Sequence, residues 1–328
     1  MLRQGQHAGL FGLRKVGKTS LINQLRSRLS LTPTVWIDCQ GYPPVAQDLF
    51  RAILGQLRVE LGFRKIGRRP RLSADGSTHG FRKEFLGLHE AWLKSGEQGR
   101  FVLIFDEADK LFPDRRIRDS ERTLGEWVLL FRMLRALAQE RNCLSVLITT
   151  YRPDVNRQNR LSPSVGENPM FMSFQEHFLG QLDENDTKTM VREIGAWKDI
   201  HWSPEALESV YELCGGHPLI TRFFASDACE QGIRKEINLA RVGEIANTIR
   251  GQFHKHRIGR YYKESVWDFL QEDERGALNL VLNGGFRGGV DDFSEAVTHL
   301  DHFGLIRTRD DGVYEVSAQL FRDWLERG

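Results

Sequence analysis

Residues 12–19 read GLRKVGKT, and this stretch fits the pattern G-x-x-x-x-G-K-[ST] at Gly12, Gly17, Lys18 and Thr19. In a loop of this kind, successive backbone N–H groups and a helix N-terminus converge on one anion. Glycine lets the backbone approach a phosphate closely, the lysine ammonium can reach the β- and γ-phosphate oxygens, and the threonine hydroxyl can bind Mg²⁺. The stretch therefore predicts a site for the polyphosphate of a nucleoside triphosphate.

The segments on either side of this loop have the order that the pattern requires. The short apolar run from His7 to Phe11 is suited to a buried parallel strand, and Ser20 opens an amphipathic helix. The alternative, an ordinary glycine-rich turn, does not explain this order of strand, loop and helix. The candidate nucleotide-binding residues are Gly12, Leu13, Arg14, Lys15, Val16, Gly17, Lys18, Thr19 and Ser20.

The composition is that of a globular protein with room for two or three domains. The chain has 328 residues, of which 40% are hydrophobic and 27% charged, and its net charge is only +2. Such a balance does not indicate a nucleic-acid partner, although local basic patches are compatible with it. Apolar runs are too short for a membrane span, and the cysteines form no C-x-x-C pair, so we expect a cytoplasmic protein without a membrane partner. The cysteines are Cys39, Cys143, Cys214 and Cys229.

Apolar runs and helical periodicity alternate in the first half of the chain. Strands are predicted at 34–38, 101–105 and 144–150, with helices at 47–61 and about 121–141. Together with the strand before the glycine-rich loop, this alternation predicts an α/β domain with a parallel sheet over residues 1–178. The basic segment 64–79 lacks apolar periodicity and is either an exposed loop or a basic patch with a function.

The second half changes to mostly helical segments. Asp183 is expected to cap a helix that runs to about Trp197, a second helix runs from Ser203 to Gly215, and a third begins at Pro218. These helices predict a helical domain over 179–258. The last part of the chain, 259–328, is predicted to form a winged helix. It has helical segments near 264–270, 272–282 and 293–303, then strands at 304–308 and 313–316 around a turn, and a final helix that ends near 325.

The strand at 101–105 ends in two carboxylates, Asp106 and Glu107. Ligands bind at the carboxyl edge of an open α/β sheet, where these side chains would project. In a Walker B motif, Asp106 would face Mg²⁺ through water, and Glu107 would orient or deprotonate the water that attacks the γ-phosphate. An apolar run followed by Asp-Glu is common by itself, but about ninety residues after a phosphate-binding loop it favours this catalytic role.

These motifs, in this order, resemble those of the STAND-type signal-transduction ATPases and the related bacterial and archaeal ATPases of the AAA+ and P-loop superfamily. The resemblance rests on GLRKVGKTSL, IFDEAD, VLITTYR and CGGHPLITRFF, and it covers most of the chain. It implies ATP or ADP with Mg²⁺ as ligands, slow hydrolysis of ATP, and a protein partner or self-association.

The resemblance also implies sensor and lid residues. In this class the strand at 144–150 lies between the strand of the phosphate loop and that of the two carboxylates, so the hydroxyl of Thr150 can sense the γ-phosphate, and Arg152 can add positive charge. The lid of such proteins presents a Gly-x-Pro turn to the nucleotide, which matches Gly216, His217 and Pro218. Polar strand exits and a helix stop before a proline-initiated helix explain the same residues structurally.

Two departures limit the resemblance. One branch of the family has Arg directly after two threonines, whereas Tyr151 intervenes here before Arg152. Family members also carry adenine-binding residues before the phosphate loop and further effector or sensor domains. Few residues precede the first strand here, so we expect a fragment or a reduced member of the family.

Three other functional classes are compatible with parts of the sequence. DEAD at 106–109 suggests an RNA helicase, but a second RecA-like domain is missing from the pattern. An origin-recognition-type AAA+ initiator, which binds DNA through its winged helix, is the stronger alternative. The expected recognition segment is acidic, with Asp291, Asp292, Glu295 and Asp301, whereas Arg307 and Arg309 in the hairpin favour DNA. A non-hydrolysing scaffold would be favoured if Glu107 were dispensable.

The sequence thus predicts an ATPase switch. Bound ADP would hold the lid and winged helix against the nucleotide domain, and exchange for Mg·ATP would favour an open or assembling form. Hydrolysis of ATP would reset the switch, with Lys18 and Glu107 as the catalytic residues and Thr19 and Asp106 as the Mg²⁺ residues.

Overall fold

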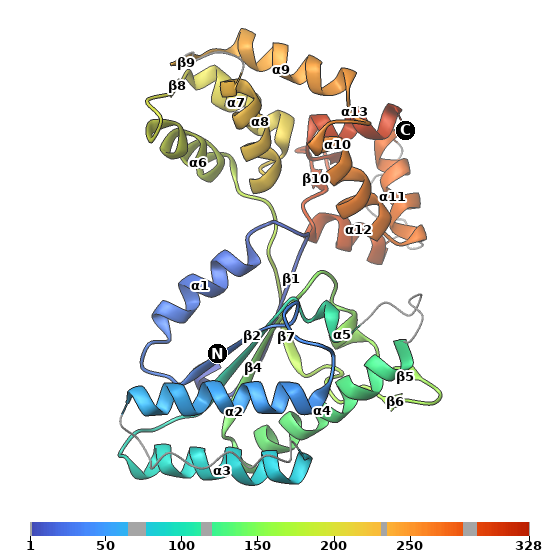
Figure 1. Ribbon diagram of the computed structural model, residues 1–328. Helices are drawn as coiled ribbons and strands as arrows, with labels where there is room; N and C mark the ends of the chain where they lie inside the picture. The colour runs from blue at the N-terminus through green and yellow to red at the C-terminus, as the bar shows by residue number, and fades with distance from the viewer. Residues whose placement is uncertain (1, 65–76, 113–119, 231–234, 285–293, 328) are drawn as a thin grey trace. The chain divides into compact units, whose positions relative to one another are not determined.

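The computed structural model describes residues 2–64, 77–112, 120–230, 235–284 and 294–327. Contacts divide the chain into two compact units, which are described separately below (Figure 1). Unit 1 comprises Met1–Phe11 and Lys18–His177, and unit 2 comprises Gly12–Gly17 and Phe178–Gly328. Most of the basic segment 64–79 lies outside the described residues, as do Asp291 and Asp292, so the predictions made for them stay predictions.

Strands and helices alternate in unit 1. Its strands are β1 (His7–Phe11), β2 (Thr34–Asp38), β3 (Phe101–Asp106), β4 (Leu144–Thr150), β5 (Arg160–Ser162), β6 (Gly166–Glu167) and β7 (Phe174–Phe178). Its helices are α1 (Lys18–Arg28), α2 (Ala46–Phe63), α3 (Thr78–Lys94), α4 (Ser120–Arg141), α5 (Asp154–Arg157) and the short 3₁₀ turns η1 (Leu2–Gln4) and η2 (Ala108–Lys110).

A five-stranded sheet in the order β2-β3-β4-β1-β7 forms the centre of unit 1. The β2–β3, β3–β4 and β4–β1 pairs are parallel, and β4 lies between β1 and β3 as predicted. Every residue of β3 and β4 is buried, which explains their continuous apolar runs, because a central parallel strand is covered on both faces. Burial alternates in β2, as it does in a strand near a sheet edge. The predicted α/β class with a parallel sheet is confirmed.

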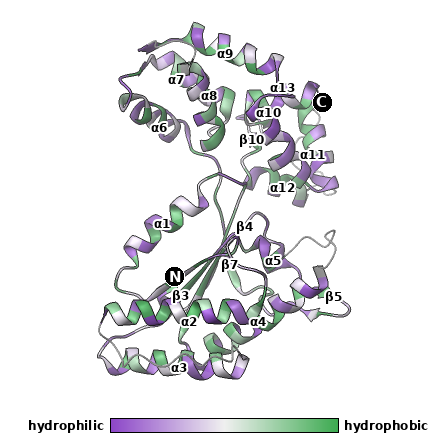
Figure 2. Ribbon diagram, in the orientation of Figure 1, coloured by the Kyte–Doolittle hydropathy of each residue, from purple (hydrophilic) through white to green (hydrophobic). Residues whose placement is uncertain are grey.

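Amphipathic helices and fully buried aromatic rings build the core around this sheet. Helix α2 packs on β2, α3 packs on α2, and α4 contacts both β4 and α2. Hydrophobic and hydrophilic residues alternate along α2 and α4 (Figure 2). The ring of Phe101 on β3 meets Phe85 of α3, and the ring of Phe105 meets Phe131 of α4. These contacts hold β3, and therefore the carboxylates at its end, in the sheet.

Helix α3 and strand β7 are among the elements of unit 1 that the sequence analysis missed. Helix α3 begins at a cap, since the Ser77 hydroxyl accepts the backbone N–H of Gly80, and its buried residues include Phe81, Phe85 and Trp92. These buried residues have the spacing of one face of a helix, and this pattern could have been recognised in the sequence. Strand β7 carries Gln, Glu and His in its interior and is only partly buried, so no apolar run marks it.

Unit 2 is mostly helical. Its helices are α6 (Glu184–Ala196), α7 (Pro204–Cys214), α8 (Pro218–Glu230), α9 (Leu239–Gly251), α10 (Arg257–Tyr261), a π-helix η3 (Tyr262–Val266), a 3₁₀ turn η4 (Trp267–Phe269), α11 (Glu272–Leu282), α12 (Ser294–His302) and α13 (Gln319–Arg327). Its strands are β8 (His201–Trp202), β9 (Glu236–Ile237), β10 (Ile306–Thr308) and β11 (Tyr314–Val316).

Helix caps in unit 2 lie where the sequence predicts them. The side chain of Asp183 accepts the Asp186 N–H at the start of α6, and that of Ser203 accepts the Ala206 N–H at the start of α7. Gly215 ends α7 in the left-handed conformation with φ 60°. These polar caps satisfy backbone groups that have no partner within the helix, so the local sequence sets the helix bounds.

The C-terminal part of unit 2 combines helices with a β-hairpin. Strands β10 and β11 are antiparallel, with Arg307 opposite Glu315, and α11 and α13 both contact β11. The structure differs from the predicted helix at 264–270. A helix starts earlier, at Arg257, with His256 as its N-cap, and it continues as a π-helix from Tyr262. All of 178–328 clusters into one unit, and the division into a lid and a winged helix near 258 stays a prediction.

Among the described helices, none combines the length and the apolar character that crossing a membrane requires.

Candidate functional site

The candidate phosphate-binding residues are divided between the two units. Residues Gly12–Gly17 cluster with unit 2, whereas Lys18 and Thr19 begin α1 in unit 1. The N-terminus of α1 carries backbone N–H groups without partners inside the helix, and such a terminus favours anions. The predicted order of strand, loop and helix is confirmed.

Within the loop, backbone geometry explains both glycines of the pattern. Gly12 has φ 150° and Gly17 has φ 112°, which are values that side chains rarely allow. A Cβ on Gly12 would also collide with the carbonyl oxygen of Leu179. Lys15 adopts the left-handed conformation with φ 62°. Left-handed residues turn successive N–H groups toward one side, which is the geometry of an anion-binding nest.

In unit 1, the carboxylate of Asp106 is held by two threonines. Its Oδ2 accepts the hydroxyl of Thr19 at 2.9 Å, and its Oδ1 accepts the hydroxyl of Thr149 at 2.5 Å. Asp106 is only 3% exposed. The Thr149 hydroxyl in turn accepts the backbone N–H of Glu107 at 2.9 Å. One threonine of β4 thus fixes both candidate Walker B residues, while the other threonine comes from the start of α1.

The edge of the sheet around Asp106 is electronegative. Burial raises the pKa of the Cys39 thiol, and the carboxylates of Asp106, Asp38, Asp109 and Glu107 raise it further. The thiol is therefore neutral, and a cation placed here would be attracted by several carboxylates.

The oxygen atoms of Thr19 and Asp106 fit a Mg²⁺ ion. The Thr19 hydroxyl donates its proton to Asp106 Oδ2 at 2.9 Å, which leaves the lone pairs of the hydroxyl oxygen for a metal ion. Asp106 would then face the ion through a water molecule. No cluster of three His, Cys, Asp or Glu side chains suited to a metal occurs within the described ranges. Mg²⁺ does not need one, because it usually keeps several waters and takes one or two protein ligands.

Glu107 has an unusual backbone conformation. It lies in the left-handed region, with φ 53° and ψ 46°, directly after β3. Such a residue costs on the order of 1–3 kcal/mol and persists only where its surroundings hold it. One restraint is the hydrogen bond from the Glu107 backbone N–H to the Thr149 hydroxyl. A second is the hydrogen bond that the side chain of Gln40 donates to the Glu107 carboxylate. The structure therefore orients the carboxylate that the sequence assigns as base.

The two candidate sensors lie at the end of β4 and just beyond it. The Thr150 hydroxyl donates to the carbonyl oxygen of Arg152, and the Arg152 guanidinium pairs with Asp154 at 3.2 Å. The structure thus brings Thr149 to Asp106, and places Thr150 and Arg152 in a local turn. The sensor roles of Thr150 and Arg152 stay predictions.

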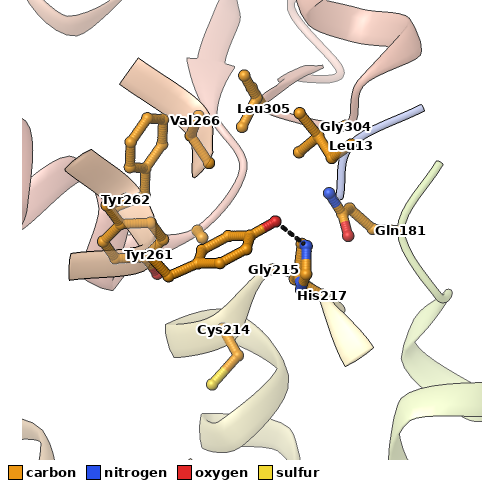
Figure 3. A pocket seen from close by; sticks show the side chains of 12 residues that line it. Leu13, Gln181, Cys214, Gly215, His217, Tyr261, Tyr262, Val266, Gly304 and Leu305 are labelled. Atoms are coloured by element: carbon orange, nitrogen blue, oxygen red, sulfur yellow. Dashed lines mark hydrogen bonds between the residues drawn. The ribbon is translucent and has the colours of Figure 1, made fainter. Parts of the chain in front are cut away.

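In unit 2, the candidate lid residue His217 contacts the phosphate loop through Tyr261. Figure 3 shows the Tyr261 hydroxyl pointing at His217, and its oxygen lies 2.7 Å from His217 Nε2. The same hydroxyl donates to the carbonyl oxygen of Arg14 at 2.7 Å. Pro218 begins α8 beside His217. Leu13 of the loop and these aromatic residues line a cavity of about 20 Å³, about the size of one water and too small for a nucleobase.

One comparison with known proteins concerns the first part of the chain. A family model described as an AAA domain matches residues 2–157, which include the phosphate loop and both carboxylates after β3. Residues 2–157 are therefore similar to an AAA domain. No curated protein matches the chain in sequence.

One solved structure shares the fold of this stretch and of the helices that follow it. The Walker-type ATPase PABY2304 of Pyrococcus abyssi matches with 16% identity and a TM-score of 0.56, over 97% of this chain and 90% of that chain. RuvB of Thermotoga maritima, a Holliday junction branch migration motor, matches with 14% identity and a TM-score of 0.44, over 95% and 84%. At 16% identity the likeness to the Pyrococcus abyssi protein concerns the fold alone.

Three residues of the site were missed or placed differently by the sequence analysis. Thr149 was given no role, and Gln40 and Tyr261 were not considered. The parallel register pairs Phe105 with Ile148, so Asp106 and Thr149 follow on the same side of the sheet. That signal was available once the strand order was assumed. Gln40 and Tyr261 reach the site from distant segments, and no local pattern marks them.

Replacing Thr149 by valine (T149V) is expected to lower the free energy of unfolding by about 1–3 kcal/mol. Valine keeps the shape but leaves the Asp106 carboxylate and the Glu107 N–H without this hydroxyl. Urea unfolding measures the change, and T149S, which keeps the hydroxyl, serves as the control. Equal stability of T149V and the wild type would show that the hydrogen bonds of the Thr149 hydroxyl do not stabilise the fold.

Proposed function

We propose that this protein binds Mg·ATP and hydrolyses it slowly to ADP and phosphate, as a STAND-like conformational switch. The observation that carries the proposal is the bonding of Asp106 between Thr19 and Thr149, which joins the end of the candidate phosphate loop to the candidate Walker B strand. The AAA domain match and the ATPase fold support nucleotide binding.

In this proposal each site residue has one role. The loop amides and the Lys18 ammonium bind the phosphate oxygens, and the hydroxyl of Thr19 and the carboxylate of Asp106 hold Mg²⁺, which neutralises phosphate charge when bound. Glu107 takes a proton from a water whose oxygen bonds to the γ-phosphorus, and the bond from that phosphorus to the β–γ bridging oxygen breaks. The products are ADP and phosphate.

The parts beyond residue 178 belong to the proposal as well. Residues 179–258 would act as a lid and 259–328 as a winged helix, whose arrangement relative to the AAA domain changes with the bound nucleotide. A protein partner or self-association would read that change. A cytoplasmic location is also proposed, on the spacing of the cysteines.

Ion pairs of the hairpin arginines argue against a DNA partner in this proposal. The guanidinium of Arg307 pairs with Glu315 at 2.7 Å and with Glu212 at 3.1 Å, and that of Arg309 pairs with Asp311 at 3.3 Å. Arginines that already pair with carboxylates attract DNA phosphates weakly, because the local charge is neutralised.

Analysis of the purified protein tests both parts of this proposal. After denaturation we expect released ADP or ATP, and in the same preparation weak binding of duplex DNA at physiological salt. Chromatography of the released nucleotide and fluorescence anisotropy with a labelled duplex measure the two properties. Tight DNA binding that is lost when Arg307 and Arg309 are changed to Glu would instead favour the origin-recognition-type initiator.

A further inference from the structure

The Tyr261 hydroxyl lies between the phosphate loop and the candidate lid turn. It donates to the Arg14 carbonyl oxygen at 2.7 Å, and its oxygen lies 2.7 Å from His217 Nε2 (Figure 3). All three residues belong to unit 2, and Tyr261 and His217 are 7% and 5% exposed. Buried hydrogen bonds of this kind are protected from competition by water.

The hydrogen-bonding capacity of each group fixes where the protons lie. A carbonyl oxygen only accepts, so the single hydroxyl proton of Tyr261 goes to Arg14, and His217 Nε2 must be the donor to Tyr261. His217 Nδ1 accepts the backbone N–H of Ile220 at 3.5 Å, which is consistent with a proton on Nε2. The bonds therefore run in one direction, from His217 through Tyr261 to the loop.

The bond to Arg14 also fixes the direction of the next amide in the loop. The described chain has no cis peptide bond, and in a trans peptide the C=O and the following N–H point in opposite directions. Because the Arg14 C=O points at Tyr261, the Lys15 N–H points away from it. Lys15 is also the left-handed residue of the loop, whose conformation needs a restraint from outside.

A second contact holds the same residue of the loop. The guanidinium of Arg14 lies over the ring of Phe269, 4.4 Å from its centroid. Tyr261 and Phe269 flank the π-helix Tyr262–Val266, and π-helical turns are frequent at functional sites. The flanking loop residues Leu13 and Val16 are buried, at 1% and 4% exposure. The backbone of Arg14 thus accepts one hydrogen bond from Tyr261, and its side chain contacts one aromatic ring.

We propose that Tyr261, held by His217, is a positioning residue for the phosphate loop: its hydroxyl orients the Arg14–Lys15 peptide so that the Lys15 N–H is set to bind a polyphosphate. This inference rests on the proposed nucleotide-binding function and deepens it. Without the hydroxyl, the loop would have to be ordered at the moment of binding, and the affinity for phosphate would fall.

The variant Tyr261→Phe tests this role, with Tyr262→Phe as a matched control. Both changes remove one hydroxyl from neighbouring buried tyrosines, but the Tyr262 hydroxyl has no hydrogen-bond partner among the described residues. We expect Y261F to lower the affinity for Mg·ATP and the affinity for Mg·tripolyphosphate by the same factor, roughly two- to tenfold. Adenosine, which lacks phosphates, should bind Y261F and the wild type alike, and Y262F should match the wild type for all ligands.

Two further measurements separate positioning from general destabilisation. Amide hydrogen exchange of the ligand-free protein should be faster at Lys15 in Y261F, while the melting temperature stays near that of Y262F. His217→Ala should weaken tripolyphosphate binding, and His217→Gln, whose amide can donate to Tyr261, should restore part of it.

The outcomes distinguish this inference from the proposed function. If the wild type binds neither nucleotide nor tripolyphosphate, the proposed function fails. If the wild type binds both and folded Y261F binds them equally well, the positioning role is overturned while the nucleotide site stands. A loss in Y261F that is equal for adenosine and tripolyphosphate would also overturn it.

Discussion

Replacing Glu107 by glutamine (E107Q) is expected to lower the rate of phosphate release from ATP by about 10²–10⁴-fold while ATP binding is retained. Glutamine has nearly the same shape as glutamate but cannot accept a proton from the attacking water. The left-handed conformation of Glu107 and the hydrogen bond from its backbone N–H to the Thr149 hydroxyl depend on main-chain atoms of Glu107. The substitution changes only the side chain, so both features stay in place. Phosphate release under single-turnover conditions, with ATP binding measured alongside, checks the expectation.

An exposed glutamate of the same domain provides the control for E107Q. Glu90 of α3 is exposed, so E90Q removes one negative charge without changing the candidate site. We expect E90Q to release phosphate at the wild-type rate. Turnover of E107Q equal to that of E90Q would remove Glu107 from the reaction and favour a scaffold that does not hydrolyse ATP.

Replacing Lys18 by alanine (K18A) is expected to weaken ATP binding by about 10–100-fold, because charge-assisted hydrogen bonds from the ammonium to phosphate are lost. Lys18 is the first residue of α1, where the helix terminus adds to the same positive potential. The loss should be larger for ATP than for adenosine, which carries no phosphate. Titration calorimetry with both ligands measures the difference.

Lys94 at the end of α3 is exposed and supplies the control, K94A. If K18A and K94A bound ATP with equal affinity, the ammonium of Lys18 would have no part in phosphate binding, and the assignment of the loop would have to be revised.

The sequence was most informative where structure is decided locally. Continuous apolar runs predicted the central strands β3 and β4, and the caps at Asp183 and Ser203 predicted where α6 and α7 begin. The glycines of the loop were interpreted as letting the backbone approach a phosphate closely, and both have positive φ. In each case a few neighbouring residues determine the outcome.

The sequence was least informative where distant segments meet. Thr149 rather than Thr150 bonds to Asp106, because strand register decides which hydroxyl shares the face of the carboxylate. Tyr261 reaches the carbonyl of Arg14 across 247 positions of sequence, and no local pattern marks such a contact. The Thr149 partner follows once strand order and register are known, whereas the Tyr261 contact depends on packing of the folded unit and could be found only in the structure.

The most direct test of the account is titration of the wild-type protein with ATP and with GTP in the presence of Mg²⁺. The account centres on the capacity of residues 12–19 to bind a polyphosphate, and it predicts heat of binding that saturates with ATP and is strongly reduced in K18A. Folded wild-type protein that takes up neither ATP nor GTP, after any bound nucleotide has been removed, would contradict it.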